Sequence, residues 1–412
     1  MTQTTPPARA WLTVALLCVV GCLNYLDRTT ITTMRSSLVS AMPMTDAQFG
    51  LLTSVFLWVY GLLSPLAGFL ADRFNRSRVI VLSLFVWSLV TFLTSQATSF
   101  EQLLATRALM GISEAAYIPA AFALIADYHR GPTRSLATGV HLTGIMAGQS
   151  LGFLGGTIAE RHSWHTAFSL FGGIGIVYAL ILVFLLRDAP TVSTASPATA
   201  TEKANVHFWK AVRDLFRRRA FLLALLCWGL TGVVSWMTIG WLPTYYKEQF
   251  NLSQSDAGLY ATAYFYPATM LGVLLGGAWS DRWSRTNPRA RLIIPIIGFC
   301  LAVPGVLIAS TTTVLLVSIA GFVLYALTRP FIDANMMPIL CLIADPRYRA
   351  TGYGILNLFS CLVGGAGIYV GGLLRDTHVD LSLMFRAAAV LLLVCAGALA
   401  LIKLRPVSTT EF

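Results

Sequence analysis

Twelve apolar runs, each long enough to cross a lipid bilayer, follow one another along this 412-residue chain. A helix needs about 20 apolar residues to span the hydrocarbon core. Only 11% of the residues are charged, whereas a soluble domain has about a quarter. The sequence therefore predicts an all-α membrane protein. The runs cover residues 11–36, 47–71, 78–98, 102–126, 135–158, 165–186, 220–246, 256–280, 292–311, 313–343, 351–374 and 381–402.

A polar segment separates the first six runs from the last six. Residues 188–219 are rich in Ser, Thr, Ala and Pro and then in Lys and Arg, as expected of a solvated connection. We predict an N-terminal six-helix bundle over 1–187, a cytoplasmic linker over 188–219 and a C-terminal six-helix bundle over 220–412.

The basic residues are unevenly divided between the two sides of the predicted membrane protein. Of 29 Lys and Arg residues, 21 fall in the termini and even-numbered loops, whereas Arg161, Lys247 and Arg375 fall on the other side. The positive-inside rule then predicts that both termini lie in the cytoplasm. We expect a multi-pass protein of the inner cell membrane. The formal charge of +11 thus indicates topology, and we expect no nucleic-acid partner.

Signals for catalysis or cofactor binding do not stand out in the sequence. No nucleophile–base constellation, phosphate-binding glycine loop or metal-ligand spacing is evident. All seven cysteines lie in apolar runs, where a packing role is expected rather than a disulfide or a metal site. We therefore expect no enzyme, no metal and no cofactor, and a monomer in the bilayer.

The chain contains an internal repeat. The segment from Gly68 to Arg76 follows the second run, and a similar segment from Gly277 to Arg285 follows the eighth, 209 residues later. The fourth and tenth runs end alike, in Leu-Ile-Ala-Asp at 124–127 and 342–345. Each half therefore has the same internal plan.

The loops of this repeat combine acidic and basic residues that can act as a gate. Charge-assisted contacts from such groups to neighbouring helix ends can hold one side of a two-bundle protein closed. The alternative is topological anchoring by basic residues alone, although the positive-inside rule does not require an Asp-Arg pair in both halves. The predicted gate residues are Asp72, Arg73, Arg76, Asp127, Arg134, Asp281, Arg282, Arg285 and Asp345.

Two predicted spans carry charges where lipid disfavours them. Asp27 and Arg28 lie in the first span, and Arg107 and Glu114 lie seven residues apart in the fourth, nearly on one helical face. Each charge at the bilayer centre costs roughly 2.5–3.5 kcal/mol on insertion scales, so such residues usually face a cavity. The helical rise puts Asp27 about 26 Å, Arg107 about 30 Å and Glu114 about 20 Å above the cytoplasmic helix ends. Asp27 and Arg107 are therefore able to meet.

The two acids are candidates for carrying protons. A dry environment raises the pKa of a carboxyl group and a neighbouring guanidinium lowers it. An acid that alternates between these surroundings can take up a proton on one side of the membrane and release it on the other. We predict this role for Asp27 and Glu114, with Arg107 as the cation beside Asp27. The alternative is a fixed Asp27–Arg107 ion pair that only orients two helices.

Arg28 is a candidate for binding a substrate anion. It follows Asp27 directly and so points about 100° away around the helix. Its planar guanidinium can bind a carboxylate through two parallel hydrogen bonds. The alternative is a permanent pair between Arg28 and Glu114.

The repeated loop resembles the Gly-x-x-x-Asp-Arg-x-Gly-Arg signature of the major facilitator superfamily. Asn75 and Ser284 stand where that family often has Gly, and Asn tolerates a left-handed backbone better than Ser does. The resemblance covers nearly the whole chain. It implies twelve transmembrane helices in two pseudo-symmetric six-helix bundles that transport a substrate by alternating access.

Other motifs resemble the anion:cation symporter family, which includes proton-coupled carriers of sugar acids, hexuronates and sialic acids. These motifs are Asn24 to Arg28, Arg107 with Glu114-Ala115, and Trp241 to Tyr245. The resemblance implies proton-coupled symport of a small organic anion such as a hexuronate, an aldonate or a sialic acid. It assigns protonation to Asp27 and Glu114, the partner of Asp27 to Arg107, and substrate proximity to Tyr25, Arg28 and Tyr60.

Two alternatives for the substrate remain open. Glu114-Ala115-Ala116-Tyr117 also resembles the bacterial spinster-like carriers, which implies a lysolipid or another amphiphile. The symporters commonly have Pro soon after the glutamate, where Ala116 stands here. Drug:proton antiporters of the superfamily have Gly-Pro where this chain has Gly148-Gln149, which disfavours a drug exporter.

Further polar and aromatic side chains in the spans are weaker substrate candidates. They are Gln149, His141, Trp241, Tyr264, Asn335, Asn357, Arg329 and Asp333. Arg329 and Asp333 are four residues apart and can instead pair with each other. A lone histidine such as His141 is more often structural, and aromatic residues also collect at membrane interfaces.

Overall fold

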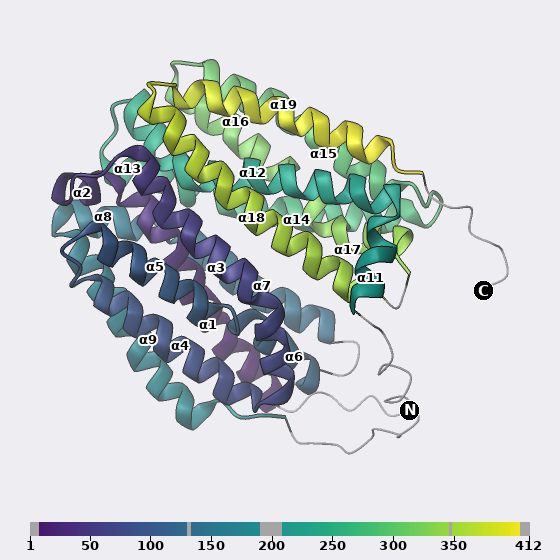
Figure 1. The fold of residues 1–412 in the computed structure, drawn as a ribbon, viewed down its shortest axis with the longest axis horizontal. Coiled ribbons are helices and arrows are strands. Elements are labelled where there is room, and N and C mark those ends of the chain that lie inside the picture. Colours follow the sequence, from purple (N-terminus) through teal and green to yellow (C-terminus); the bar gives the residue numbers. More distant parts are fainter. Residues whose placement is uncertain (1–7, 130–132, 190–207, 346–347, 404–412) are drawn as a thin grey trace. The chain divides into compact units, whose positions relative to one another are not determined.

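The computed structural model describes residues 8–129, 133–189, 208–345 and 348–403, and the regular elements in these ranges are all helices (Figure 1). Within them, eleven helical segments are long and apolar enough to cross a membrane, in agreement with the predicted membrane fold. The predicted span 135–158 is not among the eleven. It is divided between two shorter helices, and its polar residues, His141 and Gln149 included, make it less apolar than the others.

The helices keep the order that the apolar runs predict. The first half contains α1 (Ala8–Thr33), α2 (Arg35–Ala41), α3 (Asp46–Arg73), α4 (Arg76–Thr94), α5 (Phe100–Glu114), α6 (Tyr117–Tyr128), α7 (Arg134–Ser150), α8 (Phe153–Arg161) and α9 (Trp164–Leu185). The second half contains α11 (Phe208–Phe216), α12 (Arg219–Gln249), α13 (Gln254–Thr262), α14 (Phe265–Ser284), α15 (Ala290–Thr311), α16 (Leu315–Thr328), α17 (Phe331–Ile343), α18 (Arg349–Asp376) and α19 (Leu381–Ala400).

Contacts between residues divide the chain into two compact units. Unit 1 comprises Met1–Pro190, Ser235–Pro267 and Gly365–Met384, and unit 2 comprises the rest. Segments of α12, α13 and α18 thus belong with the first-half helices, because their side chains contact those helices directly. The predicted bundles at 1–187 and 220–412 follow connectivity along the chain, and this division stays a prediction.

Polar side chains determine where several helices begin. Ser99, Ser163 and Ser253 each accept a hydrogen bond from a backbone N–H in the first turn of the helix that follows. Asn75 does the same for α4, where its side chain accepts from the N–H of Arg78 at 3.0 Å. The backbone of Asn75 has φ −59°, so its place in the loop depends on capping and not on a left-handed conformation.

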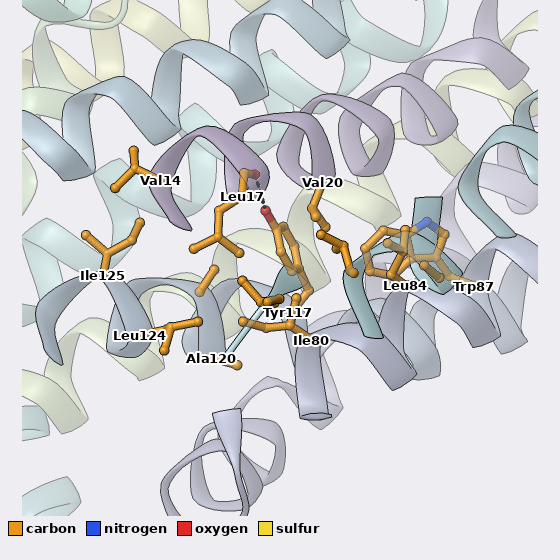
Figure 2. Packing of buried hydrophobic residues seen from close by; sticks show 14 of the residues in the cluster. Val14, Leu17, Val20, Ile80, Leu84, Trp87, Tyr117, Ala120, Leu124 and Ile125 are labelled. Carbon is orange, nitrogen blue, oxygen red and sulfur yellow. Dashed lines mark hydrogen bonds between the residues drawn. The ribbon is translucent and has the colours of Figure 1, made fainter. Parts of the chain in front are cut away.

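The core of unit 1 lies between α1, α4, α6 and α9 (Figure 2). Leu17, Leu84 and Trp87 are completely buried there with small apolar neighbours. Tyr117 lies in the middle of this cluster, and its hydroxyl donates a hydrogen bond to the carbonyl of Leu17 at 3.0 Å. Since Leu17 and Tyr117 lie on α1 and α6, the cluster fixes the two helices that flank the charged residues.

Close helix contact in unit 1 requires glycine at particular positions of α7. A Cβ atom added to Gly144 would lie 2.5 Å from the carbonyl oxygen of Cys18, and one added to Gly148 would overlap the carbonyl of Cys22. The backbones of α1 and α7 therefore touch directly, as small residues allow in membrane helices.

We expect Gly148→Ala to destabilise the protein, because the added methyl group has to push α7 away from α1. Overpacking of this kind costs about 1–3 kcal/mol, which outweighs the gain of up to about 1 kcal/mol in helix propensity. The measurement is the apparent melting temperature in detergent. Gly173→Ala on α9, where an added Cβ meets nothing within 4 Å, is the control and should match or slightly exceed the wild type.

Candidate functional site

Four charged side chains lie buried inside unit 1, on two helices. Asp27 and Arg28 come from α1, and Arg107 and Glu114 come from α5. Glu114 is the last residue of α5, and the chain turns before α6 begins at Tyr117. At most 6% of each of the four residues is exposed. Since the two acids and two bases are formally neutral together, the group can stay buried without a net charge.

Arg28 and Glu114 form a direct ion pair. Arg28 Nε lies 2.7 Å from Glu114 Oε2, a length typical of a charge-assisted hydrogen bond. Arg28 Nη2 and Glu114 Oε1 are buried and have no hydrogen-bond partner among the described residues. The pair therefore uses only one of the two parallel contacts that a guanidinium and a carboxylate can make.

Aromatic rings surround the Arg28 guanidinium. Its Cζ lies 4.5 Å from the ring centre of Tyr25, 4.5 Å from that of Tyr60 and 5.0 Å from that of Phe56. These distances are within the range of cation–π attraction, which is stronger in a desolvated site. Phe56 also lies 5.0 Å from the Arg107 guanidinium, so one ring contacts both buried arginines. Phe56 was not predicted as a site residue, although its spacing of four residues from Tyr60 puts both on one face of α3.

Asp27 lies apart from the Arg28–Glu114 pair. Its Oδ2 accepts a hydrogen bond from the Thr91 hydroxyl at 3.4 Å, and the charges of Glu114 and Arg107 act on it through space. Arg107 Nη1 contacts the Met110 sulfur at 3.1 Å, while its Nε and Nη2 have no hydrogen-bond partner among the described residues. The structure thus brings Asp27 and Arg107 into electrostatic range without a direct ion pair.

The other candidates in unit 1 lie outside this charged group. His141 is fully buried, with the rings of Tyr117 and Phe122 at its edges, and neither ring nitrogen has a partner in the described part of the chain. Gln149 is buried further along α7. Such placement is compatible with packing roles for both.

The two aromatic candidates also lie elsewhere in unit 1. Trp241 is fully buried and its indole N–H donates to the carbonyl of Ile368 at 3.2 Å, which ties α12 to α18. Tyr264 is 51% exposed, as expected of an interfacial aromatic residue.

The four remaining candidates, which lie on α17, α18 and the turn before α17, belong to unit 2. Arg329 Nη1 lies 2.5 Å from Asp333 Oδ2 within one helical turn. Asn335 Oδ1 accepts a hydrogen bond from the Ser280 hydroxyl at 2.5 Å, and Asn357 is half-buried. The Arg329–Asp333 contact is the local pairing that the sequence left open as an alternative to a substrate role.

Predicted gate residues form ion pairs in both units. Arg76 pairs with Asp127 in unit 1, and Asp281 pairs with Arg291 at 3.1 Å in unit 2. Arg291 was not among the predicted residues. Other gate candidates are exposed, namely Arg73, Arg134, Arg282 and Arg285, and Asp345 is half-buried. The side chain of Asp72 lies outside the described part of the structure.

A charged network that was not predicted from the sequence lies in unit 1. Arg375 on α18 holds Asp46 through Nε at 2.9 Å and Glu248 through both terminal nitrogens at 2.9 Å. Arg35 pairs with Asp46 and lies 3.5 Å from Glu248. Asp376 caps α3 by accepting hydrogen bonds from the backbone N–H groups of Asp46 and its neighbour. The only sequence signal was the presence of Arg375 on the side with few basic residues.

We expect Arg375→Ala to lower the stability of unit 1. The side chains of Arg375 and Asp46 are only 13% and 14% exposed. Removing the arginine therefore takes away a cation that neutralises the carboxylates of Asp46 and Glu248. Truncating one partner of such a pair costs at least about 2 kcal/mol. The apparent melting temperature in detergent should fall. Arg161→Ala, at an exposed arginine of the same predicted side, should leave it unchanged.

The sequence matches the Major Facilitator Superfamily over residues 17–368 and again over 232–411. It is 28% identical to the protein spinster homolog 1 of Homo sapiens over 391 residues, 90% of this chain and 74% of the relative. It is 27% identical to an MFS-type efflux pump of Mycolicibacterium smegmatis over 394 residues, 95% of this chain and 90% of the pump.

Solved structures of transporters share the fold. A bacterial homolog to the human lysosomal transporter Spinster, in an inward-facing and occupied conformation, aligns with a TM-score of 0.79 at 24% identity over 97% of both chains. A nucleoside transporter aligns with a TM-score of 0.75 at 14% identity, over 94% of this chain and 99% of the other. These relatives are transporters and not enzymes. The match over most of the sequence shows that the chain belongs to the major facilitator superfamily of membrane transporters.

Proposed function

We propose that the protein is a proton-coupled transporter in which a substrate anion and the Glu114 carboxylate compete for Arg28. The observation that carries this proposal is the buried ion pair of 2.7 Å between these two side chains. While Glu114 is ionised, it occupies the guanidinium. A protonated Glu114 no longer offers a charge, and Arg28 is then free for an anion.

This competition makes the proton and the anion move across the membrane in the same direction. The anion binds only after a proton has bound to Glu114, so both enter the site together and leave together. A carboxylate or phosphate on Arg28 would make two parallel hydrogen bonds, one more than Glu114 makes. The rings of Tyr25, Phe56 and Tyr60 exclude water and strengthen the interaction. The proposed cycle is therefore symport of a proton and an organic anion by alternating access.

Asp27 and Arg107 form the second part of the proposed proton pathway. Asp27 is buried, is hydrogen-bonded to a hydroxyl and lies within electrostatic range of both Glu114 and Arg107. Protonation of one acid changes the field at the other, so we propose that the two carboxylates titrate as a coupled pair. Arg107 stabilises whichever carboxylate is ionised.

Two classes of substrate fit an anion site at Arg28. A small sugar acid, such as a hexuronate or a sialic acid, provides the carboxylate and hydroxyl groups. An anionic amphiphile such as a lysolipid is the second candidate, and the similarity to spinster homologues favours it.

The test is a counterflow screen in proteoliposomes. Sugar acids, sialic acid and lysolipids are each tried beside a neutral analogue, for example a hexuronate beside the parent hexose. The proposal expects exchange of at least one anion and none of its neutral analogue, with accumulation driven by an inward proton gradient. Equal exchange of the charged and neutral forms would contradict an anion site at Arg28.

A further inference from the structure

Unit 2 contains a strongly basic pocket at the end that the distribution of Lys and Arg predicts to be cytoplasmic. Its volume is about 550 Å³, and it lies where α11 meets α12, where α17 ends and α18 begins, and beside the end of α19. Five basic side chains and one carboxylate, that of Asp345, line it. The basic residues are Arg217, Arg218, Arg219, Arg349 and Lys403.

Two of these arginines hold the pocket together. Arg218 pairs with Asp214 of α11 at 2.9 Å and donates to the carbonyl of Ile343 at 3.2 Å. Arg349 donates to the carbonyl of Cys341 at 3.0 Å. Both carbonyls belong to the last turn of α17, where the helix dipole is negative and the carbonyls lack helical partners. These contacts fix α11 and α18 to the end of α17.

The other three cations are available to a ligand. Arg217, Arg219 and Lys403 are exposed and make no side-chain ion pair or hydrogen bond with any described residue. The buried Nε of Arg349 also has no partner within the described ranges. Cations held this close repel one another, and an anion with several oxygens relieves that repulsion. Charge complementarity therefore points to a phosphate group.

Exposed apolar side chains on the elements that form the pocket indicate which phosphate compound fits. Trp209 on α11 is 79% exposed, and Leu401, beside Lys403, is 68% exposed. Leu342 lines the pocket itself and is 37% exposed. An exposed tryptophan on a short amphipathic helix next to basic residues is typical of the membrane interface. A free phosphate ion would leave these apolar surfaces exposed to water, whereas acyl chains would cover them.

We propose that this pocket binds the headgroup of an anionic phospholipid from the leaflet on the predicted cytoplasmic side. The phosphodiester lies among Arg217, Arg219 and Lys403, and the acyl chains contact Trp209 and the exposed leucines. A bound lipid would thereby connect α11 to the ends of α17 and α19. This proposal does not depend on the substrate of the charged site in unit 1.

The test measures lipid binding to the purified full chain in detergent by native mass spectrometry. We expect saturable binding of phosphatidylglycerol, and binding at least ten times weaker for phosphatidylcholine with the same acyl chains. Combined replacement of Arg217, Arg219 and Lys403 by Gln should weaken phosphatidylglycerol binding at least tenfold. The matched control replaces Arg282, Arg285 and Arg289 by Gln, because these exposed residues lie in the same unit but do not line the pocket.

Three outcomes would overturn the proposal. Equal weakening in both triple variants would mean that general basic charge attracts the lipid. Displacement of the lipid by equimolar inorganic phosphate would mean that the pocket binds a free anion. Binding that does not saturate would leave the basic residues with a purely topological role. Trp209→Ser separates the two parts of the ligand, because it should weaken phosphatidylglycerol binding without changing the binding of glycerol phosphate.

Discussion

Replacing Glu114 with glutamine is expected to abolish accumulation driven by a proton gradient while leaving exchange intact. Glutamine mimics the protonated acid, so Arg28 stays free for the anion at every pH. The variant should therefore catalyse counterflow with little pH dependence, whereas its accumulation ratio under an inward proton gradient should fall to about one. Glutamine can still accept a hydrogen bond from Arg28, which limits the cost of leaving a buried charge unpaired, otherwise about 3–5 kcal/mol.

The control for this variant is Glu101→Gln. Glu101 lies on the same helix, α5, but is exposed at its first turn, so its replacement removes the same charge outside the site. Both functions should survive there. Retained counterflow shows that E114Q has folded, and retained accumulation in that variant would remove Glu114 from the coupling role. Asp27→Asn is measured in parallel, since unchanged accumulation in both variants would exclude the pair of acids altogether.

Much of the fold could be predicted from the sequence, because the apolar runs and the repeated loop reflect constraints that act locally. A membrane span needs a sufficiently long run of apolar residues wherever it lies in the chain. The Asp-Arg motif can be recognised in both copies of the repeated loop. The span 135–158 is also helical, but it contains polar residues, and the glycines at 144 and 148 allow it to contact α1 closely.

The site could be predicted only in part, because residue counting gives depth along a helix but not direction across the bundle. The four charges were identified from their cost in lipid. Depth along the helices predicted that Asp27 and Arg107 can meet. In the structure, Asp27 instead contacts Thr91 directly, and Glu114 contacts Arg28. In the sequence, Phe56 cannot be distinguished from a phenylalanine of the apolar core. In the structure, its ring lies beside both Arg28 and Arg107.

The network around Arg375 could not be predicted from the sequence, for a different reason. Arg35, Asp46, Glu248 and Arg375 are separated by up to 340 positions, and each one alone resembles an ordinary loop charge. Only the contacts within unit 1 reveal that they pair. Long-range pairing of this kind depends on which helix ends meet. The packing of all helices in the unit determines this, and no local sequence motif does.

Arg28→Lys should separate the anion site from the proton site. Lysine keeps the positive charge, so the pair with Glu114 and the response to a proton gradient should persist. It loses the planar fork and stacks less favourably on the rings of Tyr25 and Tyr60, so the substrate is held by fewer hydrogen bonds. The loss of one charge-assisted hydrogen bond, about 1.5–3 kcal/mol, corresponds to an increase in KM of about tenfold or more.

The measurement is the concentration dependence of transport at two pH values, made for Arg28→Lys and for Arg107→Lys. Arg107 has no assigned contact with the substrate, so its replacement should change the pH dependence and leave KM nearly unaltered. If Arg28→Lys transports with the affinity of the wild type, the anion is bound elsewhere. A KM that rises equally in both variants would mean that the two arginines act only through their shared contact with Phe56 and the packing around it.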